Sequence, residues 1–352
     1  MIKSKYDIVG VMSGTSLDGI DLAHVTLEFN DTWSFKIHQA ETIPYPPSWK
    51  NELSNLVGLN LEGLQEMDRR YTSYLAEVIA VFLRKHELQH IDAVCSHGHT
   101  ALHQPEQNLT YQIGNLKSIA ELTKQRVVCD FRTQDVQFGG QGAPLVPIGD
   151  RLLFSEYDYC INLGGFANLS SEVNHERIAF DICPVNIVMN RYAELLGLDF
   201  DRDGKIAQSG EIDQGMLDAL NNLEYYQAIP PKSLGLEWVE DHVFKVLKSS
   251  NISKADVLRT FVEHIAFQIA QQIHVDSKVL FTGGGAYNTF LMKRIAAQKR
   301  IHSVLPSNIL IEYKEALIFG LLGVLKLRNE VNCLSSVTGA KMDHSSGAIY
   351  NP

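Results

Sequence analysis

Residues 10–21 combine residue types that suit the binding of an anion. One apolar run ends at Met12 and another begins at Ile20, which predicts a tight turn between two strands. Glycine lets backbone N–H groups approach an anion closely, and hydroxyl side chains add hydrogen-bond donors. An ordinary glycine-rich hairpin would have the same composition, so the segment alone leaves both interpretations open. The candidate phosphate contacts are Gly10, Ser13, Gly14, Thr15, Ser16 and Asp18.

Two acidic side chains in the same segment could bring a metal ion to the anion. Asp18 and Asp21 could hold such an ion through water molecules. A second acidic run, residues 199–204, looks like the start of an EF-hand calcium loop. Gly210 stands where that loop needs its bidentate glutamate, so calcium binding is not expected there. The sequence assigns no residue as a direct metal ligand.

Two further glycine turns follow apolar runs later in the chain. Gly164 and Gly165 lie between two predicted strands, whereas Gly283, Gly284 and Gly285 lie between a strand and a helix near Asn288. A helix after the third turn would direct its positive N-terminus toward whatever the glycines approach. Together the turns predict two hairpins that grip phosphates from opposite sides of a cleft, with the third turn beneath a nucleoside. Three unrelated turns remain the alternative.

The elements that would position these turns occur twice in the same order. The first half predicts strands at 6–12, 20–29 and 33–42, a helix at 61–85, a strand at 93–96, a short helix at 116–123 and a strand at 127–130. The second half predicts strands at 157–163, 166–170 and 177–181, a helix at 186–196, an insertion at 199–250, a helix at 255–273 capped by Ser253, a strand at 279–282, a helix from 288 and a last helix at 314–327.

This repetition predicts two related α/β domains, residues 1–150 and 151–330, with a cleft between them. Residues 331–352 are expected to form a polar, loosely held tail. The length of 352 residues, with 45% hydrophobic and 20% charged residues, fits two folded domains.

Composition also limits the partners and the compartment. The net charge of −10 and the lack of a basic stripe argue against a nucleic-acid partner. Neither a signal peptide nor a run of 18 apolar residues is evident, so a cytoplasmic protein without a membrane partner is expected. The cysteines are odd in number and widely spaced, which indicates buried free thiols rather than disulfides or a zinc site. They are Cys95, Cys129, Cys160, Cys183 and Cys333.

The three turns resemble those of the actin, hexokinase and Hsp70 superfamily of ATP-handling folds. Within it, residues 10–21 are similar to the signature of the anhydro-N-acetylmuramic acid kinase family. Further blocks that resemble the family follow in order at 96–100, 112–114, 130–135, 139–147, 162–165, 231–233, 283–286 and 315–317. The resemblance covers residues 6–327.

This resemblance implies a fold, a reaction and its cofactors. The fold would be a pair of duplicated actin-like ATPase (ribonuclease H-like) domains flanking an ATP cleft. The family uses ATP and Mg²⁺ to phosphorylate 1,6-anhydro-N-acetylmuramic acid. Water opens the anhydro bridge, and the product is N-acetylmuramic acid 6-phosphate, a step of cell-wall recycling. The partners would be ATP, the sugar and a second copy of the chain in a homodimer.

The resemblance also implies roles for four side chains. Asp181 would be the base that activates water; its alternative role is capping the helix predicted near Asn186. Arg132 would bind a carboxylate or phosphate, unless it forms a surface ion pair with Asp135.

The other two side chains are also assigned to the substrate. His97 would donate to a sugar oxygen, unless it is a satisfied buried histidine. Glu315 would face the substrate, unless it complements a helix dipole.

The chain departs from the family pattern beside the expected base. Residues 182–185 read Ile-Cys-Pro-Val where the family usually has Thr-Gly-Pro-Gly, and His99 stands where glutamine is common. Two alternatives to the expected activity therefore remain open. They are a kinase of a different (anhydro-)sugar and a nucleotide-binding sensor without turnover.

Overall fold

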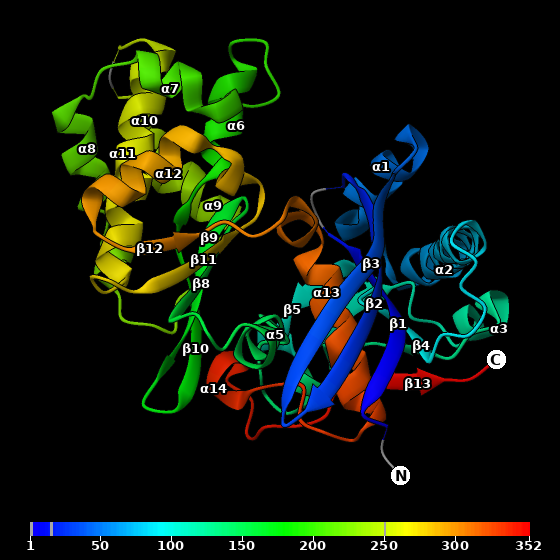
Figure 1. Ribbon diagram of the computed structural model, residues 1–352. Helices are drawn as coiled ribbons and strands as arrows, with labels where there is room; N and C mark the ends of the chain where they lie inside the picture. The colour runs from blue at the N-terminus through cyan, green and yellow to red at the C-terminus, as the bar shows by residue number, and fades with distance from the viewer. Residues whose placement is uncertain (1–2, 15–16, 250) are drawn as a thin grey trace. The chain divides into compact units, whose positions relative to one another are not determined.

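The computed structural model describes residues 3–14, 17–249 and 251–352, and the chain divides into two compact units. Unit 1 comprises residues 1–153 and 313–352, and unit 2 comprises residues 154–312. Each unit is an α/β structure built on its own sheet (Figure 1). The boundary expected after residue 150 lies close to the observed one after residue 153. Residues 313–330, expected in the second domain, and the expected tail at 331–352 instead belong to unit 1.

The sheet of unit 1 positions the first glycine turn. Its strands follow the spatial order β13-β7-β4-β1-β2-β3. Strands β1, β2 and β3 form an antiparallel meander, and β4 and β7 run parallel to β1. The bounds are β1 Lys5–Ser13, β2 Gly19–Asn30, β3 Thr32–Pro44, β4 Ala93–Ser96, β7 Val127–Cys129 and β13 Ala348–Tyr350.

Strand β1 is buried on both faces, and alternate side chains meet different helices. Val9 and Val11 belong to the core cluster that includes Tyr71 and Leu75 of α2. Ile8 lies on the other face, against Gly320 of α13. This arrangement follows from the two-residue period of a strand, because successive side chains point to opposite faces.

The helices of unit 1 cover this sheet and carry several of the candidate residues. A small hairpin, β5 His99–Gln104 with β6 Leu109–Ile113, follows β4. The helix bounds are α1 Pro47–Ser54, α2 Leu61–Lys85, α3 Ser118–Thr123, α4 Thr133–Gln137, α5 Pro147–Leu153, α13 Asn308–Leu327 and α14 Ser335–Thr338. Helix α13 is irregular at Tyr313, and its residues from that point onward belong to unit 1.

Unit 2 repeats the same strand order, which confirms the expected duplication of an α/β fold. Its sheet has the order β10-β9-β8-β11-β12, with an antiparallel meander followed by two parallel strands. The bounds are β8 Tyr159–Leu163, β9 Phe166–Val173, β10 Glu176–Pro184, β11 Lys278–Thr282 and β12 His302–Val304. Strand for strand, β8 of unit 2 corresponds to β1 of unit 1, and each is followed by a glycine turn.

Unit 2 contains the insertion expected at 199–250, which holds helices α7, α8, α9 and α10. The helix bounds of this unit are α6 Asn186–Glu194, α7 Lys205–Ser209, α8 Gln214–Asn221, α9 Leu236–Trp238, α10 Phe244–Leu247, α11 Lys254–Gln272 and α12 Thr289–Gln298. Ser253 caps α11 as expected, since its hydroxyl accepts the Asp256 N–H. Phe261 and Ile265 of α11 pack in the same core cluster as Ile161 and Leu163 of β8.

The expectation of a loosely held C-terminal tail is wrong. Strand β13 pairs with β7, and Asn332 is fully buried. The Asn332 amide donates to the carbonyls of Leu322 and Ser346 and accepts the Ser346 N–H. A polar sequence at this end of the chain is therefore held by hydrogen bonds that its composition does not reveal.

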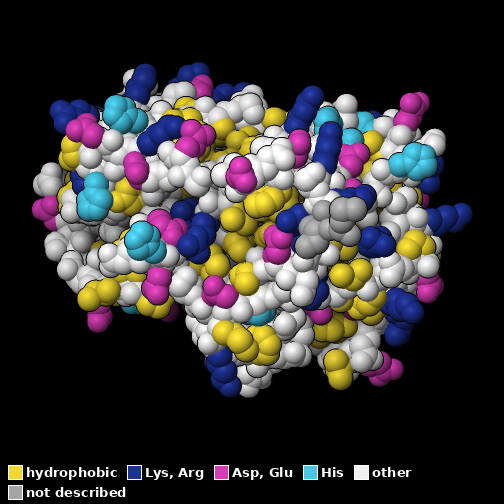
Figure 2. All heavy atoms as spheres, turned by 60° about the horizontal axis from the view of Figure 1, so that its bottom comes forward, with side chains coloured by type: hydrophobic (Ala, Val, Ile, Leu, Met, Phe, Trp, Pro, Cys, Tyr) yellow, Lys and Arg dark blue, Asp and Glu magenta, His cyan; other side chains and the backbone are white. Residues whose placement is uncertain are grey.

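The surface carries charges of both signs, and the cysteines lie inside the protein. Lys and Arg side chains are interspersed with Asp and Glu side chains on the face drawn in Figure 2. All five cysteines are buried and free, as expected. Within the described ranges, no helix has the length and apolar character needed to span a membrane.

Candidate active site

The first glycine turn joins β1 to β2 in unit 1. At this turn Gly14 is half-buried, and Asp18 is exposed. The Gly14 carbonyl accepts the Leu17 N–H at 3.4 Å. Thr15 and Ser16, which the sequence assigned to phosphate binding, lie outside the described residues. Gly14 and Asp18 therefore remain the candidate phosphate contacts that the structure describes at this turn.

The Ser13 hydroxyl is hydrogen-bonded inside unit 1. It is 2% exposed, and its Oγ accepts a hydrogen bond from the Tyr71 hydroxyl at 2.9 Å. The same Oγ lies 2.6 Å from the Tyr45 hydroxyl and 2.8 Å from His99 Nδ1. In this structure the Ser13 hydroxyl is part of a buried polar network, so its assignment to the nucleotide stays a prediction that would require these hydrogen bonds to be exchanged.

Gly10 is required for the packing of a helix on β1. It lies inside β1, and an added Cβ would overlap the carbonyl oxygen of Ala316 in α13. Gly320 of α13 faces Ile8 in the same way. A close backbone approach at Gly10 is therefore observed, and the approaching group in this structure is helix α13.

The side chains of Arg132 and His97 are hydrogen-bonded to each other in unit 1. Arg132 Nε donates to His97 Nε2 at 2.8 Å, and Arg132 Nη1 donates to the Gly142 carbonyl at 2.6 Å. His97 Nδ1 must donate to the Gly98 carbonyl, 2.9 Å away, because a carbonyl oxygen can only accept. Both ring nitrogens of His97 are therefore used within the protein. Burial, followed by the charge of Arg132, holds its pKa well below the usual value, so the ring is neutral.

These contacts change the roles expected for the pair. His97 cannot donate to a sugar oxygen while it makes both bonds, so the alternative of a satisfied buried histidine describes it better. The expected alternative for Arg132 is also not observed, because the Asp135 carboxylate accepts the Thr338 hydroxyl and the Gly142 N–H. Among the residues that the structure describes, Arg132 Nη2 makes no hydrogen bond. That nitrogen is available to a ligand.

Glu315 interacts electrostatically with Arg132 of the same unit. It lies in α13, two residues after the irregular Tyr313, and its side chain is exposed. The helix begins at Asn308, earlier than the predicted start at residue 314. Although Glu315 reaches solvent, desolvation by surrounding protein raises its pKa, and the positive charge of Arg132 opposes this effect. The two side chains form a pair of opposite charge in unit 1.

The second and third glycine turns lie against each other in unit 2. Gly283 has a φ of +80° and an added Cβ would meet Asn162 Oδ1 at 2.6 Å, while a Cβ on Gly285 would meet the Leu163 side chain at 2.8 Å. Gly165 and Gly284 differ, because both are exposed and a Cβ there would meet nothing closer than 3.9 Å. Gly283 and Gly285 thus join the two turns, and Gly165 and Gly284 present backbone to open space.

Helix α6, which follows β10, directs its first backbone donors at the second turn. The N–H groups of Asn186 and Ile187 bond the carbonyls of Gly164 and Gly165, respectively. The Asn186 amide donates to the Leu163 carbonyl at 3.1 Å. These bonds fix Gly164 and Gly165 against the start of α6, so the turn has a defined shape.

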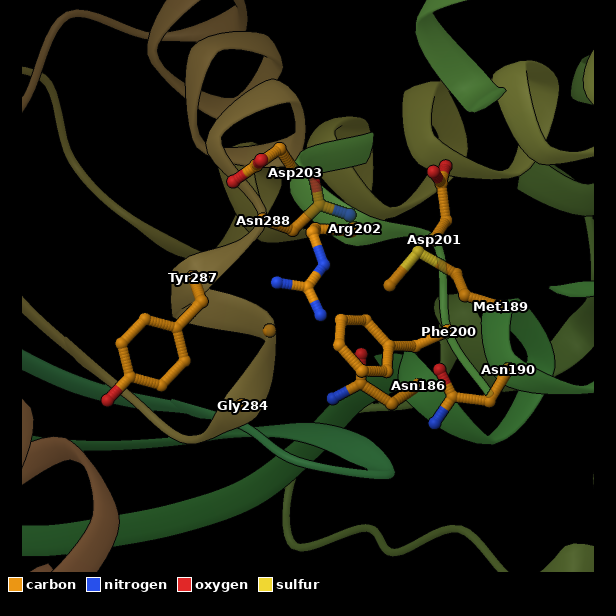
Figure 3. A pocket seen from close by; sticks show the side chains of 11 residues that line it. Asn186, Met189, Asn190, Phe200, Asp201, Arg202, Asp203, Gly284, Tyr287 and Asn288 are labelled. Atoms are coloured by element: carbon orange, nitrogen blue, oxygen red, sulfur yellow. The ribbon is translucent and has the colours of Figure 1, made fainter. Parts of the chain in front are cut away.

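A pocket of about 470 Å³ opens beside the third turn (Figure 3). Its walls come from α6, from residues 200–203 and from the third turn itself. The lining residues are Asn186, Met189, Asn190, Phe200, Asp201, Arg202, Asp203, Gly284, Gly285, Tyr287 and Asn288. Its size and its mix of apolar and amide side chains suit a small organic ligand.

Within this pocket Arg202 and Phe200 form a wall that the sequence did not predict. The guanidinium lies 5.5 Å from the centre of the Phe200 ring, and Figure 3 shows it directed into the cavity. The Asp201 carboxylate instead accepts the N–H groups of Ile206 and Ala207 at the start of α7. Asn288, expected at the nucleotide, lines the pocket, although its side-chain oxygen caps α12 by accepting the Leu291 N–H. In the sequence, the segment that forms this wall is the acidic run at 199–204, which resembles the start of a calcium loop.

Asp181 lies within β10 of unit 2 rather than at its end. The strand continues to Pro184, with a register shift between Asp181 and Cys183. Asp181 Oδ2 accepts the Leu234 N–H at 2.9 Å, and no described residue bonds Oδ1. Burial raises the pKa of the carboxyl, and the Leu234 N–H opposes that effect. Asp181 does not cap α6, because that helix begins after Val185 without a side-chain cap.

The departures beside Asp181 lie in the core. Ile182, Cys183 and Val185 are at most 2% exposed and belong to the main hydrophobic cluster of unit 2. His99, the other departure, is bonded to Ser13 in unit 1 and is also buried. These side chains therefore fill interior space, and none of the three in unit 2 lines the pocket.

Two α/β units with one strand order, each with a glycine turn after its first strand, define the actin-like class of ATPases and sugar kinases. The comparison with known families is more specific. A family model described as anhydro-N-acetylmuramic acid kinase matches residues 6–352. The chain belongs to this family, whose members are phosphotransferases that act on a sugar hydroxyl.

Curated relatives are similar over nearly their whole length. The anhydro-N-acetylmuramic acid kinase of Pasteurella multocida is 35% identical and matches 97% of this chain and 96% of its own. The enzyme of Mannheimia succiniciproducens is 34% identical and matches 99% of this chain and 100% of its own. Component A of the (R)-2-hydroxyglutaryl-CoA dehydratase of Acidaminococcus fermentans covers 92% of this chain and 99% of its own, at 12% identity and a TM-score of 0.44. That structural similarity is too weak to support a conclusion.

Proposed function

We propose that this chain converts 1,6-anhydro-N-acetylmuramic acid, ATP and water into N-acetylmuramic acid 6-phosphate and ADP. Water attacks the anomeric carbon as Asp181 accepts its proton. The bond between that carbon and O6 breaks, and its electron pair stays on O6. O6 then attacks the γ-phosphorus of ATP and ADP leaves. The family membership supports this reaction, and cell-wall recycling is its context.

The single observation that carries the proposal is the state of the Asp181 carboxyl. A general base needs a free oxygen and a pKa closer to the working pH than that of an ordinary aspartate. Asp181 Oδ1 is unbonded among the described residues, and burial raises the pKa of the group. The Leu234 N–H holds the other oxygen, which restricts the orientation of the carboxylate.

The pocket of unit 2 supports the placement of the nucleoside. The exposed backbone of Gly284 offers a flat surface on which a base can lie, and Arg202 with Phe200 forms a cationic, aromatic wall. The amide side chains of Asn186 and Asn190 suit the polar edges of a purine and a ribose. We assign the phosphates to the turns that contain Gly14, Gly164 and Gly165. At the second turn the Gly164 N–H already donates to the Phe166 carbonyl at 3.1 Å, so the exposed Gly165 is the candidate backbone donor there.

Arg132 is the candidate for recognising the sugar. The lactyl group of the substrate carries a carboxylate, and Arg132 Nη2 is a free donor on a guanidinium that two other bonds hold in place. Glu315, of opposite charge nearby, would accept hydrogen bonds from sugar hydroxyls. His97 is assigned to positioning Arg132 rather than to touching the substrate.

Mg²⁺ is part of the proposal as the ion that accompanies ATP. Oxygen ligands suit it, and the donors near the first turn are carboxylates. Asp18 is exposed, and Asp21 accepts the Thr42 hydroxyl at 2.6 Å, which would orient it toward an ion held through water. When bound, the ion would neutralise charge on the phosphates. A cytoplasmic location and a homodimer are proposed from the family resemblance.

A coupled assay of ADP release tests the activity. We expect ADP only when the anhydro-sugar, ATP and Mg²⁺ are all present, with little or none from free hexoses or other anhydro-sugars. Asp181→Asn should lower kcat by at least about 100-fold, the usual contribution of a general base, while ATP binding by calorimetry persists. The control is Asp241→Asn, an exposed aspartate of the same unit that forms an ion pair with Lys245.

Three results would contradict the proposal. Preference for another sugar would show that the acceptor is different, and ATP binding without turnover on any sugar would show a sensor. Normal turnover by Asp181→Asn would remove the assigned base. The homodimer is tested separately by light scattering, which should give twice the molar mass of one chain.

A further inference from the structure

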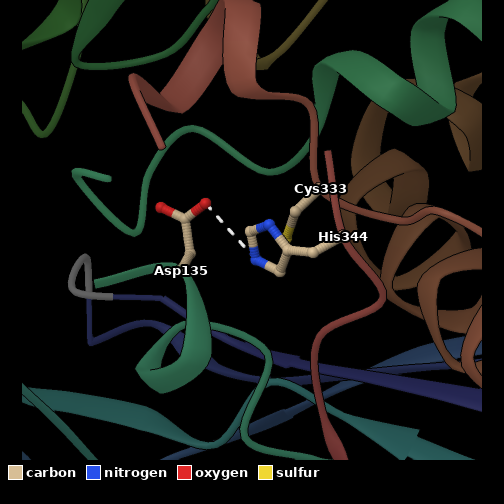
Figure 4. A group of neighbouring side chains, drawn as sticks. All are labelled: Asp135, Cys333 and His344. Atoms are coloured by element: carbon tan, nitrogen blue, oxygen red, sulfur yellow. Dashed lines mark ion pairs between the residues drawn. The ribbon is translucent and has the colours of Figure 1, made fainter. Parts of the chain in front are cut away.

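Asp135, Cys333 and His344 form a buried cluster in unit 1, and none of them takes part in the reaction proposed above. Asp135 comes from α4, whereas Cys333 and His344 come from the C-terminal segment (Figure 4). One potential ligand atom of each residue lies within 4.8 Å of the other two. From this geometry we propose that the cluster binds a divalent transition-metal ion, for which zinc is the best match.

The hydrogen bonding of His344 leaves one ring nitrogen without a partner. His344 Nδ1 lies 3.1 Å from the Met342 carbonyl oxygen, which can only accept, so Nδ1 carries the proton. Nε2 is then the ring atom that can bind a further proton or a metal ion. This atom is buried and has no hydrogen-bond partner among the described residues, and the side chain is only 5% exposed. A buried nitrogen of this kind calls for a proton or a cation.

The distance to Asp135 favours a cation over a simple ion pair. His344 Nε2 and Asp135 Oδ1 are 3.5 Å apart. A charge-assisted N–H···O bond is shorter, about 2.7–2.9 Å. Nitrogen and oxygen ligands of a tetrahedral zinc ion, at bond lengths near 2.1 Å, are separated by about 3.4 Å. The observed gap is therefore wide for a hydrogen bond and right for two ligands of one ion.

Both of these ligands are already oriented by further hydrogen bonds. Asp135 Oδ1 accepts the Thr338 hydroxyl and Oδ2 accepts the Gly142 N–H, each at 2.7 Å. His344 donates its other nitrogen to a backbone carbonyl. Metal-binding carboxylates and histidines show this pattern of outer contacts.

The chemistry of the donor set selects the metal. A thiolate and an imidazole favour zinc or a related ion over Mg²⁺ and Ca²⁺, which prefer oxygen. Once Cys333 loses its proton, the thiolate and the carboxylate balance the two charges of the ion, so that no net charge is buried. A fourth ligand would be water or another small donor. Asp135 lies three residues after Arg132, so an ion here would hold the C-terminal segment to the Arg132 segment.

Metal content and binding of the full-length chain test this proposal without an activity assay. We expect purified protein to retain one zinc per chain by mass spectrometry after dialysis against a weak chelator. Co²⁺ added to the stripped protein should give a thiolate-to-metal absorption band in the near ultraviolet. Cys333→Ser should abolish the band, and Cys333→Ser and His344→Gln should each abolish the retained zinc.

The control variants separate this site from other thiols and histidines. Cys95→Ala removes a buried thiol of the same unit, and His90→Gln removes an exposed histidine, so both should retain zinc and the cobalt band. Wild-type protein that binds neither ion overturns the proposal, as does zinc retained equally by Cys333→Ser and His344→Gln. If either of these two variants fails to fold by circular dichroism, the cobalt band of the wild type decides, and its absence overturns the proposal.

Discussion

Asp181 shows how burial can prepare a single residue for chemistry. The surrounding protein raises the pKa of its carboxyl above the ordinary 3.8, and one backbone N–H works against the shift. A base must be ionised to accept a proton, so protonation at low pH removes it.

The first prediction is an acid limb in the pH profile of the reaction. kcat/KM should fall as pH drops through the raised pKa of Asp181, with a midpoint above 3.8, because the free enzyme loses the ionised base. Initial rates of ADP release across the pH range measure it. The residual rate of Asp181→Asn should lack this limb, and an identical limb in that variant would assign it to another group.

Arg132 and His97 show a different arrangement, in which one residue acts through another. His97→Ala should remove the hydrogen bond that holds Arg132 Nε. Because the guanidinium would then be less well oriented, KM for the sugar should rise on the order of tenfold, which corresponds to the loss of one buried hydrogen bond. KM for ATP and kcat should change much less. Steady-state kinetics with both substrates varied provides the measurement.

Two further variants define that role. Arg132→Lys should raise KM for the sugar at least as much, because lysine lacks the planar fork. His90→Gln, an exposed histidine, is the control. A fall in kcat with unchanged sugar KM in His97→Ala would mean that His97 does not act through sugar binding.

At the scale of elements, the glycines of the turns have separate tasks. Gly10 admits α13, Gly283 and Gly285 join two turns, and Gly284 presents bare backbone to the pocket. At each of these positions glycine leaves space for a different neighbour: a helix, another turn or a ligand in the pocket. Stability and nucleotide binding should therefore respond to different glycine substitutions.

Gly10→Ala tests the packing of α13 on β1. The added methyl group would overlap the Ala316 carbonyl, so the helix or the strand must shift, at about 1–3 kcal/mol of unfolding free energy. Urea unfolding measures the change. Gly58→Ala, where nothing lies within 4 Å of the added Cβ, should be nearly neutral. Equal stability of the two variants would contradict the packing role.

Gly284→Val tests the pocket. The position is exposed, and its Cβ would meet only Asn186 Nδ2 at 3.9 Å, so stability should be retained. The larger side chain would occupy the surface assigned to the nucleoside and raise KM for ATP on the order of tenfold or more. Thermal unfolding and ATP titration are the two measurements. Unchanged ATP binding would place the nucleoside elsewhere.

At the scale of the whole molecule, the C-terminal segment completes unit 1. β13 covers the edge strand β7, and Ser346 inside the segment donates to the Phe131 carbonyl at 2.7 Å. Removal of residues 347–352 should lower Tm, because it exposes the backbone of β7 and the apolar surface beneath. Calorimetry measures the shift. Removal of residues 351–352 alone, which are exposed, should have little effect, and equal Tm values for both truncations would contradict the role of β13.

Much of the fold is predictable because its signals are local. The limits of α2 and β4 match the sequence prediction to the residue, since helical and strand spacing of apolar residues act over short stretches. The repeated order of elements predicts the duplication, and the positions of all three turns follow from glycine after an apolar strand. Asp181, Arg132 and Glu315 were assigned through the family motifs around them.

The partners of those residues were decided only by the tertiary structure. Ser13 meets Tyr71, Arg132 meets His97, and Asp135 meets Thr338, which is 203 residues away. Local patterns specify an element and its buried face, but a hydrogen bond between distant side chains exists only after the intervening chain has packed. The sequence therefore determined the class of fold and the family. The structure decided which polar groups are already satisfied inside the protein and which, such as Asp181 Oδ1 and His344 Nε2, remain available to a ligand.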